Sequence, residues 1–191
     1  MRVVLEPLAG IPNDESDLIA RIRAGDEAAF RALYLAHHDG LWKFAYTYVR
    51  SRDVAEELVQ DVFLSLWGTR ASWQVTTRVR AWLFAAVRNL ALNHLRHERV
   101  VARTAHVESS TMGERPPGQQ ETVEANELDE AIERALAELP ERRRIAMTLR
   151  WKEDMSPLEI ANVLGTTPEA VRVLLSRART DLAALLDRVR R

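Results

Sequence analysis

Apolar residues recur along most of this 191-residue chain at the three- and four-residue spacing of an α-helix. No stretch alternates between apolar and polar residues for long enough to predict a sheet. The clearest amphipathic segment is 54–67, where apolar residues return at i, i+1, i+4 and i+5. We therefore predict an all-α protein.

The first two helices are predicted on either side of a glycine. A helix is expected over 14–24, because Gly25 can end it and Asp26 can cap the next one. Residues 37–40 (HHDG) either interrupt this second helix or lie on it, and the pattern leaves both possibilities open.

Two further helices complete the first half of the chain. Asp53, with Glu56 three residues later, is expected to form a capping box at the start of the 54–67 helix. The helix expected over 80–97 is apolar around most of its circumference, which indicates a position at the centre of its domain.

The stretch 156–179, SPLEIANVLGTTPEAVRVLLSRAR, predicts two helices joined by a tight turn. Ser156 and Glu159 form a capping box, Gly165 can end the first helix, and Thr167 can cap the second. A proline follows each cap at the first helical position. This is the pattern of a helix-turn-helix.

A stretch without periodicity, rich in Pro, Gly, Ser, Thr and Gln, separates the two groups of helices. Helices resume at 124–138 and 140–151, ahead of the helix-turn-helix. The predicted organisation is a disordered segment at 1–13, a helical domain at 14–100, a flexible linker at 101–124 and a helix-turn-helix domain at 125–191.

The second helix of the predicted helix-turn-helix has two distinct faces. Its apolar stripe must face a core, and consists of Val171, Leu174, Leu175, Ala178 and Leu182. Arg172, Ser176 and Arg179 lie on another face. A helix held in this way can enter a DNA major groove, whereas the alternative is an ordinary helical hairpin whose arginines are solvated.

Charge is segregated along the chain, although the net charge is only −1. Residues 70–103 carry seven arginines against one acid, 104–138 carry nine acids against two arginines, and 168–191 carry six arginines against three acids. Two basic regions therefore flank an acidic connector, and each is a candidate phosphate-binding surface.

Composition narrows the function classes further. The chain has no cysteine, its five histidines lack zinc-ligand spacing, and it has no nucleophile-and-base constellation or phosphate loop. We expect no metal, no cofactor and no enzymatic activity. No apolar run approaches a membrane span and the start has no signal-peptide pattern, so we expect a cytoplasmic protein without membrane insertion.

Taken together, three blocks of sequence resemble the sigma-70 family of bacterial transcription initiation factors, in its short extracytoplasmic-function (ECF) group. The blocks are DEAAFRALYLAHHDGLWKFAYTYV followed by AEELVQDVFLSLW, then RAWLFAAVRNLALNHLRHERV, then LPERRRIAMTLRWKEDMSPLEIANVLGTTPEAVRVLLSRAR. The resemblance implies a noncatalytic subunit that binds core RNA polymerase, recognises promoter −10 and −35 elements and helps to open the duplex.

The outer face of the 54–67 helix is the expected polymerase-binding surface. It carries Glu56, Glu57, Gln60 and Asp61, a largely acidic set that suits a basic partner. In the family, the positions that match Glu57, Gln60 and Asp61 bind the clamp helices of the largest polymerase subunit. The alternative is a solvated charged face.

The segment 70–97 is expected to bind the −10 element and hold unpaired bases. Trp82 matches an aromatic position at the family's melting edge, unless it serves only core packing, and Asn89 matches a position that lines a pocket for an extruded base. Trp73, in the 68–77 loop, is expected to be the more exposed tryptophan. Arg80, Arg88 and Arg96 are expected to neutralise phosphates.

The second helix of the helix-turn-helix is expected to read the −35 element. The resemblance assigns it the residues Thr167, Glu169, Arg172, Val173, Ser176, Arg177 and Arg179. Arg172 and Ser176 are the best candidates for base edges, with Arg177 and Arg179 for phosphates. Val173 and Leu174 stand where the family often has serine and arginine, which removes one polar base contact.

Two other classes of protein remain open. A helix-turn-helix repressor would act without polymerase, and a sigma-like decoy would only sequester an anti-sigma factor. An anti-sigma factor is also the expected partner of a free sigma factor in this group, and the free chain is expected to be a monomer.

Overall fold

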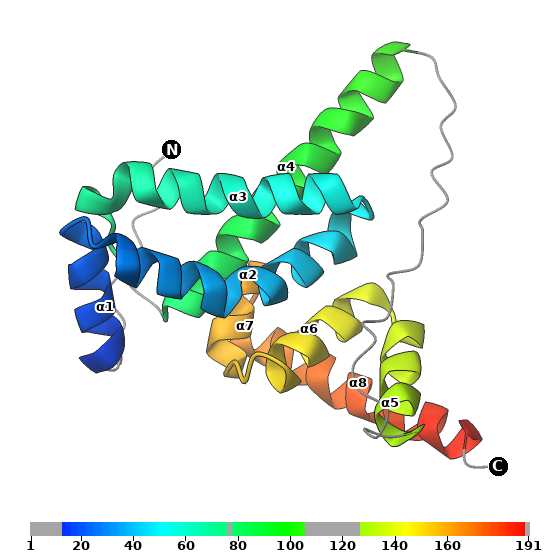
Figure 1. Cartoon of the computed structure of the whole chain (residues 1–191). Helices are drawn as coiled ribbons and strands as arrows, with labels where there is room; N and C mark the ends of the chain where they lie inside the picture. Colours follow the sequence, from blue (N-terminus) through cyan, green and yellow to red (C-terminus); the bar gives the residue numbers. More distant parts are fainter. Residues whose placement is uncertain (1–12, 76–77, 106–126, 190–191) are drawn as a thin grey trace. The chain divides into compact units, whose positions relative to one another are not determined.

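The protein folds into two helical units in the computed structural model, which describes residues 13–75, 78–105 and 127–189 (Figure 1). The units are Met1–Glu114 and Arg115–Arg191. The first contains α1 (Asn13–Arg23), α2 (Glu27–Val49), α3 (Arg52–Thr69), the 3₁₀ helix η1 (Arg70–Ser72) and α4 (Val79–Ala105). The second contains α5 (Glu127–Glu138), α6 (Glu141–Trp151), α7 (Pro157–Leu164) and α8 (Pro168–Val189). No strand occurs in the described ranges, so the all-α prediction is confirmed.

Two sequence predictions fall partly outside the described residues. The disorder expected at 1–13 concerns residues that are not described, except that Asn13 already belongs to α1. The linker expected at 101–124 begins too early, because α4 continues to Ala105; its remaining residues are not described.

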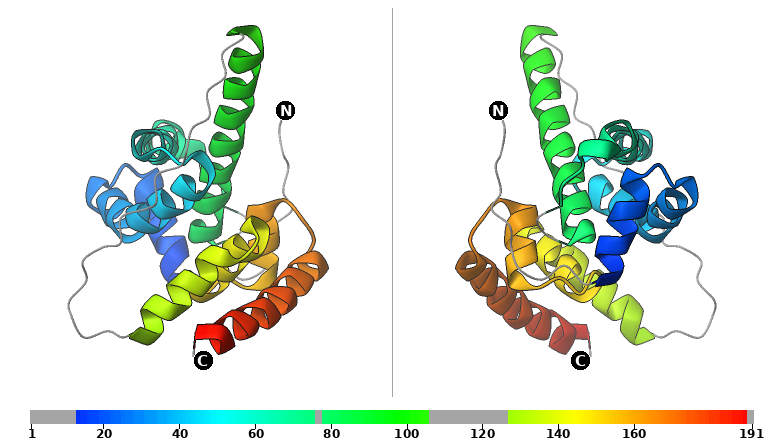
Figure 2. Two further views of the ribbon diagram at one scale, coloured as in Figure 1. Left: turned by 90° about the vertical axis from the view of Figure 1, so that its right-hand side faces the viewer. Right: turned by 90° about the vertical axis from the view of Figure 1, so that its left-hand side faces the viewer.

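The first unit is organised around the contact of α2, α3 and α4. Helices α2 and α3 run side by side and α4 crosses them, while α1 packs against α2 and η1 (Figure 1, Figure 2). Leu41 of α2, Val59 of α3 and Leu83 of α4 are each fully buried. The rings of Phe44 and Phe84 join α2 to α4 edge-on, with centroids 5.0 Å apart.

The connection between α1 and α2 forms as the sequence predicts. Gly25 adopts a φ of +87°, a conformation that favours glycine, and reverses the chain after α1. The Asp26 carboxylate then caps α2 by accepting a hydrogen bond from the Ala29 backbone N–H at 3.0 Å. From this cap α2 continues unbroken through residues 37–40, which decides the question that the pattern left open.

The capping box predicted for α3 at Asp53 and Glu56 is wrong. Arg50 closes α2 in the left-handed conformation, with a φ of +55°, so Ser51 is the next extended residue. The Ser51 hydroxyl accepts a hydrogen bond from the Val54 N–H at 3.4 Å and starts α3 two residues earlier than predicted. Asp53 therefore lies inside the first helical turn, where a negative charge favours the helix dipole.

The second unit is assembled on α8, which packs against α5, α6 and α7. Its buried stripe includes Val171, Leu175 and Leu182, and on the helices that it packs against, Met147 of α6 and Ile160 of α7 are fully buried. An ion pair between Arg143 of α6 and Asp181 of α8 adds a polar contact at the edge of this core.

The helix-turn-helix joint between α7 and α8 confirms the capping pattern. The Ser156 hydroxyl accepts from the Glu159 N–H at 3.3 Å, while the Glu159 carboxylate accepts from the Ser156 N–H at 2.7 Å. Gly165 ends α7 in the left-handed conformation with a φ of +61°. The Thr167 hydroxyl then accepts from the Ala170 N–H at 3.2 Å and caps α8.

Replacing Ser156 with alanine should destabilise the second unit by about 1 kcal/mol, because the Glu159 N–H loses its acceptor. Amide exchange of α7 and α8 that requires unfolding should then become about fivefold faster in the full-length protein, measured by mass spectrometry. Thr180→Ala is the matched control. Its exposed hydroxyl bonds only to the carbonyl of Ser176 within the same helix, so exchange should not accelerate. Equal acceleration in both variants would contradict the role of the cap.

Candidate functional site

The outer face of α3 presents polar residues on a helix whose other face is buried. Ala55, Leu58, Val59, Val62, Phe63 and Leu66 point into the core of the first unit. Glu57, Gln60 and Asp61 are exposed and, at spacings of three and four residues, share one face. Three of the four residues predicted to bind polymerase are thus displayed together.

Leu64 lies on the same face, one turn beyond Gln60 and Asp61, and its side chain is 69% exposed. Sequence reasoning missed it. The signal was available, since Leu64 is out of register with the buried stripe of Val62, Phe63 and Leu66. An exposed leucine beside two polar residues gives this face an apolar contact as well as negative charge.

Glu56 differs from its neighbours on α3 because its carboxylate is engaged within the unit. His38 of α2 places its Nε2 atom 3.1 Å from both carboxylate oxygens, and the Gln60 side-chain amide donates to Oε1 at 2.9 Å. The Tyr34 ring lies against the His38 ring, with centroids 4.9 Å apart. The structure therefore fixes one of the predicted binding carboxylates by a contact between helices.

The same contacts act on the ionisation of Glu56. Partial burial raises the pKa of its carboxyl, but the hydrogen bonds from Gln60 and His38 and the charge of His38 outweigh burial and hold the pKa below its ordinary value. Burial, and next the negative charge of Glu56, raise the pKa of Tyr34. Glu56 is therefore held in its charged form.

On α4, three of the residues predicted to contact the −10 element share one face. Trp82, Asn89 and Arg96 follow one another at intervals of seven residues, close to two helical turns. Asn89 and Arg96 are exposed and Trp82 is half-buried, while Arg88 is half-buried on a neighbouring face. The Arg96 guanidinium donates to the Asn93 side-chain oxygen at 2.7 Å.

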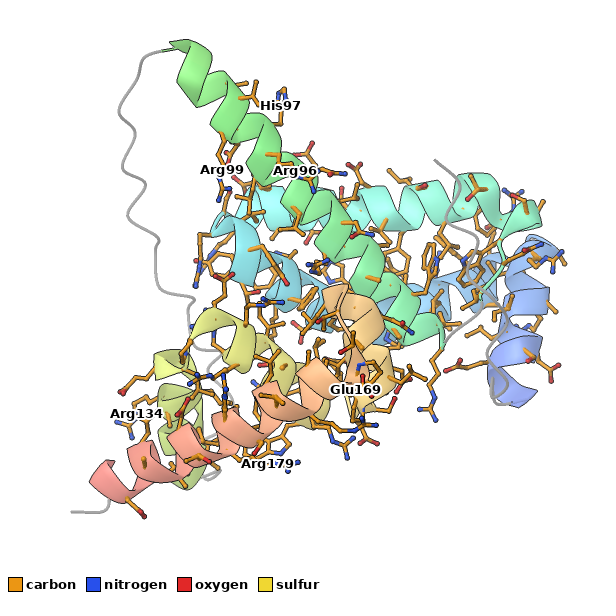
Figure 3. The ribbon with its side chains drawn as sticks, turned by 180° about the vertical axis from the view of Figure 1, so that it is seen from behind. Arg96, His97, Arg99, Arg134, Glu169 and Arg179 are labelled. Carbon is orange, nitrogen blue, oxygen red and sulfur yellow. The ribbon has the colours of Figure 1, made fainter. Side chains whose placement is uncertain are left out.

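The final turns of α4 extend past the other helices of the first unit (Figure 1, Figure 2). Figure 3 shows Arg96, His97 and Arg99 on this stretch. Residues 96–101 are all exposed. The extension therefore presents basic side chains that no other helix of this unit covers.

The prediction that Trp73 is the more exposed tryptophan is wrong. Its side chain is only 5% exposed, because η1 turns the chain back and brings the indole against α4. The Trp73 and Trp82 rings meet edge-on with centroids 5.5 Å apart. Trp82 presents the outer ring of this pair, and Trp73 supports it from the protein side.

Arg80 is also less accessible than the sequence suggested. It is half-buried, and within the described residues its Nε atom is buried without a hydrogen-bond partner. Burial, and next the positive charge of Arg80, lower the pKa of His37 on α2. Arg80 therefore acts electrostatically on α2 as well as at the surface of α4.

All seven residues predicted to bind the −35 element, six on α8 and Thr167 at its cap, are exposed. The Arg172 guanidinium donates to the Glu169 carboxylate at 3.1 Å. The pKa of Glu169 is lowered, first by a hydrogen bond from its own backbone N–H at the helix start and then by the bond from Arg172. In Figure 3, Glu169 and Arg179 lie along α8, and Arg134 lies on α5 of the same unit.

The described part of the chain also answers two simpler questions. It contains no helix that is both long and apolar enough to cross a membrane. Across the same residues, no group of three or more His, Cys, Asp or Glu side chains is arranged to hold a metal ion.

Comparison with known proteins gives the same two-part division. The family profile described as "Sigma-70 region 2" matches residues 33–100, and the one described as "Sigma-70, region 4" matches residues 129–182. The ECF RNA polymerase sigma factor SigM of Mycobacterium tuberculosis is 30% identical over 184 residues, covering 90% of this chain and 84% of SigM.

Two solved structures share the fold. The sigma factor RpoE of Bartonella quintana, in complex with the anti-sigma factor NepR, superposes with a TM-score of 0.62 and 26% identity, over 83% of this chain and 96% of RpoE. CnrH, in complex with the cytosolic domain of CnrY, gives a TM-score of 0.59 and 25% identity, over 92% and 98% of the two chains.

Replacing His38 with alanine should raise the pKa of the Glu56 carboxyl, since a hydrogen bond and a positive charge that favour the carboxylate are lost. Because the pKa of Glu56 is depressed in the folded state, its stabilising contribution is present above the unfolded pKa and is lost as pH falls through the folded pKa. The variant should therefore lose part of its acid-side pH dependence of stability. An NMR pH titration of the Glu56 carboxyl measures the change directly.

His94→Ala is the matched control for this titration. It removes a second histidine beside a carboxylate, Glu98 on α4 at 3.4 Å, and should leave the titration of Glu56 unchanged. A Glu56 titration in His38→Ala that coincides with the wild type would show that the contact between α2 and α3 does not set the ionisation.

Proposed function

The chain belongs to the sigma-70 family as an ECF sigma factor, a transcription initiation factor, and we propose that its two units carry out separate parts of promoter recognition. In this assignment residues 14–100 form sigma region 2 and residues 125–191 form region 4, joined by 101–124. The observation that carries the proposal is the display of exposed polar and basic faces on α3, α4 and α8, each backed by a buried apolar face.

The exposed face of α3 binds core RNA polymerase. Glu57, Gln60 and Asp61 present negative charge and hydrogen-bonding groups, and suit a basic helical surface on the largest polymerase subunit. Glu56 contributes a carboxylate already oriented by His38 and Gln60. A side chain ordered before binding loses less conformational entropy on association.

The exposed face of α4 engages the −10 element. Opening a duplex requires a surface that holds unpaired bases better than the duplex does, through stacking and positive charge. Trp82 supplies an aromatic ring that packs against Trp73. Asn89, about two turns further along α4, supplies an amide, and Arg96 supplies positive charge. Arg80 and Arg88, both half-buried, add positive potential behind this face.

The exposed face of α8 reads the −35 element. A helix-turn-helix places the N-terminal residues of its second helix at base edges in the major groove. Arg172 and Ser176 take that role, with Thr167 and Glu169 at the start of the helix and Arg177 and Arg179 directed to phosphates. The exposure of these polar groups at the start and along the outer face of α8 supports this assignment.

An anti-sigma factor binds the protein and holds it inactive. The protein does not associate with further copies of itself. The two solved structures described above each contain another protein, named as an anti-sigma factor in the complex with RpoE. The chain acts in the cytoplasm as a non-enzymatic subunit of polymerase, without a metal or cofactor of its own.

Run-off transcription tests the function as a whole. Purified core polymerase should produce transcripts from genomic fragments only when this protein is added, and the sequences upstream of their start sites should share −10 and −35 elements.

The Asp61→Lys variant should bind core polymerase at least about tenfold more weakly, because it reverses charge on the polymerase-facing surface. The loss of affinity should shrink at high salt.

Asp39→Lys is the matched control for charge reversal. Asp39 is an exposed acid on α2 rather than α3, and is paired with Lys43 at 2.8 Å. The Asp39→Lys variant should bind core polymerase as the wild type does.

If the unmodified protein binds DNA but does not bind core polymerase, the result favours a repressor. If it binds core polymerase but no fragment yields a transcript, the result favours a decoy.

Replacing Arg172 with alanine should weaken discrimination of the −35 element by about 1 to 3 kcal/mol, the value of a good base contact. Competition binding of the holoenzyme to promoters with intact and scrambled −35 elements measures this discrimination. Arg134→Ala, which removes an arginine of the same unit on α5, should leave the ratio unchanged. A wild-type ratio in Arg172→Ala would remove α8 from base recognition.

A further inference from the structure

Val173 lies on the side of α8 opposite its buried stripe. Its side chain is 49% exposed, although Val171, Leu175 and Ala178 around it are buried. At about 100° per residue, Val173 lies about 200° around the helix from Val171, directly opposite the core. It therefore lies on the side of α8 that a docking partner would meet.

Most of the exposed residues around Val173 on this face are polar or charged, whereas Ala170 and Leu174 beside it are half-buried. Glu169 lies one turn before it, and Ser176 and Arg177 lie one turn after it, all exposed. Arg172, next to it, is paired with Glu169 at 3.1 Å. Val173 is thus an exposed apolar group on a largely polar surface.

A valine at a base edge has a narrow choice of contacts. It has no side-chain donor or acceptor, so it cannot satisfy the polar groups that guanine, adenine and cytosine present in the major groove. Thymine alone presents a methyl group there, at C5. Burial of a methyl-sized apolar surface between the two groups is favourable, whereas a polar base edge opposite the valine would lose its water.

We propose that Val173 selects a thymine in the −35 element by contact with its C5-methyl group. The inference rests on the proposed function, in which α8 enters the major groove. It assigns a specificity to the position where the sequence lacks the polar residue common in the family. Exposed apolar side chains are common singly on protein surfaces, but this one lies at the centre of the proposed reading face.

A methyl-deletion scan tests the proposal on both partners. Each thymine of the −35 element, on either strand, is replaced in turn by deoxyuridine, which lacks only the C5-methyl group. Binding of each duplex is measured with holoenzyme containing wild-type protein, Val173→Ala or Arg172→Ala. Val173→Ala should fold normally, because the site is exposed and alanine favours a helix more than valine does.

At one thymine, the wild type should lose about fourfold in affinity on methyl removal, the equivalent of burying about one methylene. Val173→Ala should be insensitive to methyl removal at that position and keep the wild-type response elsewhere. Arg172→Ala should keep the methyl response at the same position, although its overall −35 discrimination is weaker. Such non-additive effects of the Val173→Ala substitution and of methyl removal would demonstrate a direct interaction between the valine side chain and that methyl group.

Three results would overturn the proposal. They are a wild-type protein insensitive to every methyl deletion, a Val173→Ala variant with unchanged sensitivity, and a −35 element without thymine on either strand. If Arg172→Ala still loses −35 discrimination in those cases, the proposed function stands and only the role of Val173 fails. If Arg172→Ala discriminates like the wild type, the placement of α8 in the groove fails as well.

Discussion

Burial of one apolar stripe per helix is the constraint on which the rest of this structure depends. A helix that buries residues at spacings of three and four must expose the residues between them. On α8 the stripe of Val171, Leu175 and Leu182 holds together α5, α6 and α7, and it thereby turns Arg172, Val173 and Ser176 outward. The core of the second unit and its proposed DNA-reading face are two consequences of the same spacing.

The sequence predicted best those features that depend on a few neighbouring residues. The capping box of Ser156 and Glu159, the glycine that ends α7 and the cap at Thr167 are local hydrogen-bonding patterns, and each formed as expected. The start of α3 was predicted less well, because two candidate caps stood close together. Arg50 adopts the left-handed conformation and ends α2, so that Ser51 becomes the cap of α3. The sequence of residues 53–56 contains no sign of this conformation.

Features that depend on contact between helices could not be predicted. His38 and Glu56 are 18 residues apart, and their pairing depends on how α2 and α3 are aligned. Trp73 looked exposed because its segment has loop composition, yet η1 folds the indole under Trp82. The helix break considered at residues 37–40 did not occur, since the buried residues on either side, Leu33 and Leu41, outweigh the modest cost of an interior glycine.

Arg172 is already paired with Glu169, so in the proposed complex it gives up this carboxylate in order to contact DNA. A solvated arginine gains from any phosphate it meets, whereas Arg172 must first leave a carboxylate that accepts a hydrogen bond from its guanidinium. Glu169, once released, repels a nearby phosphate but can accept a hydrogen bond from a cytosine amino group. If α8 docks in the groove as proposed, the pair lowers affinity for arbitrary duplex more than for a sequence that receives both side chains. A sigma factor that searches a genome gains from this, because less of it is held at the very numerous wrong sites.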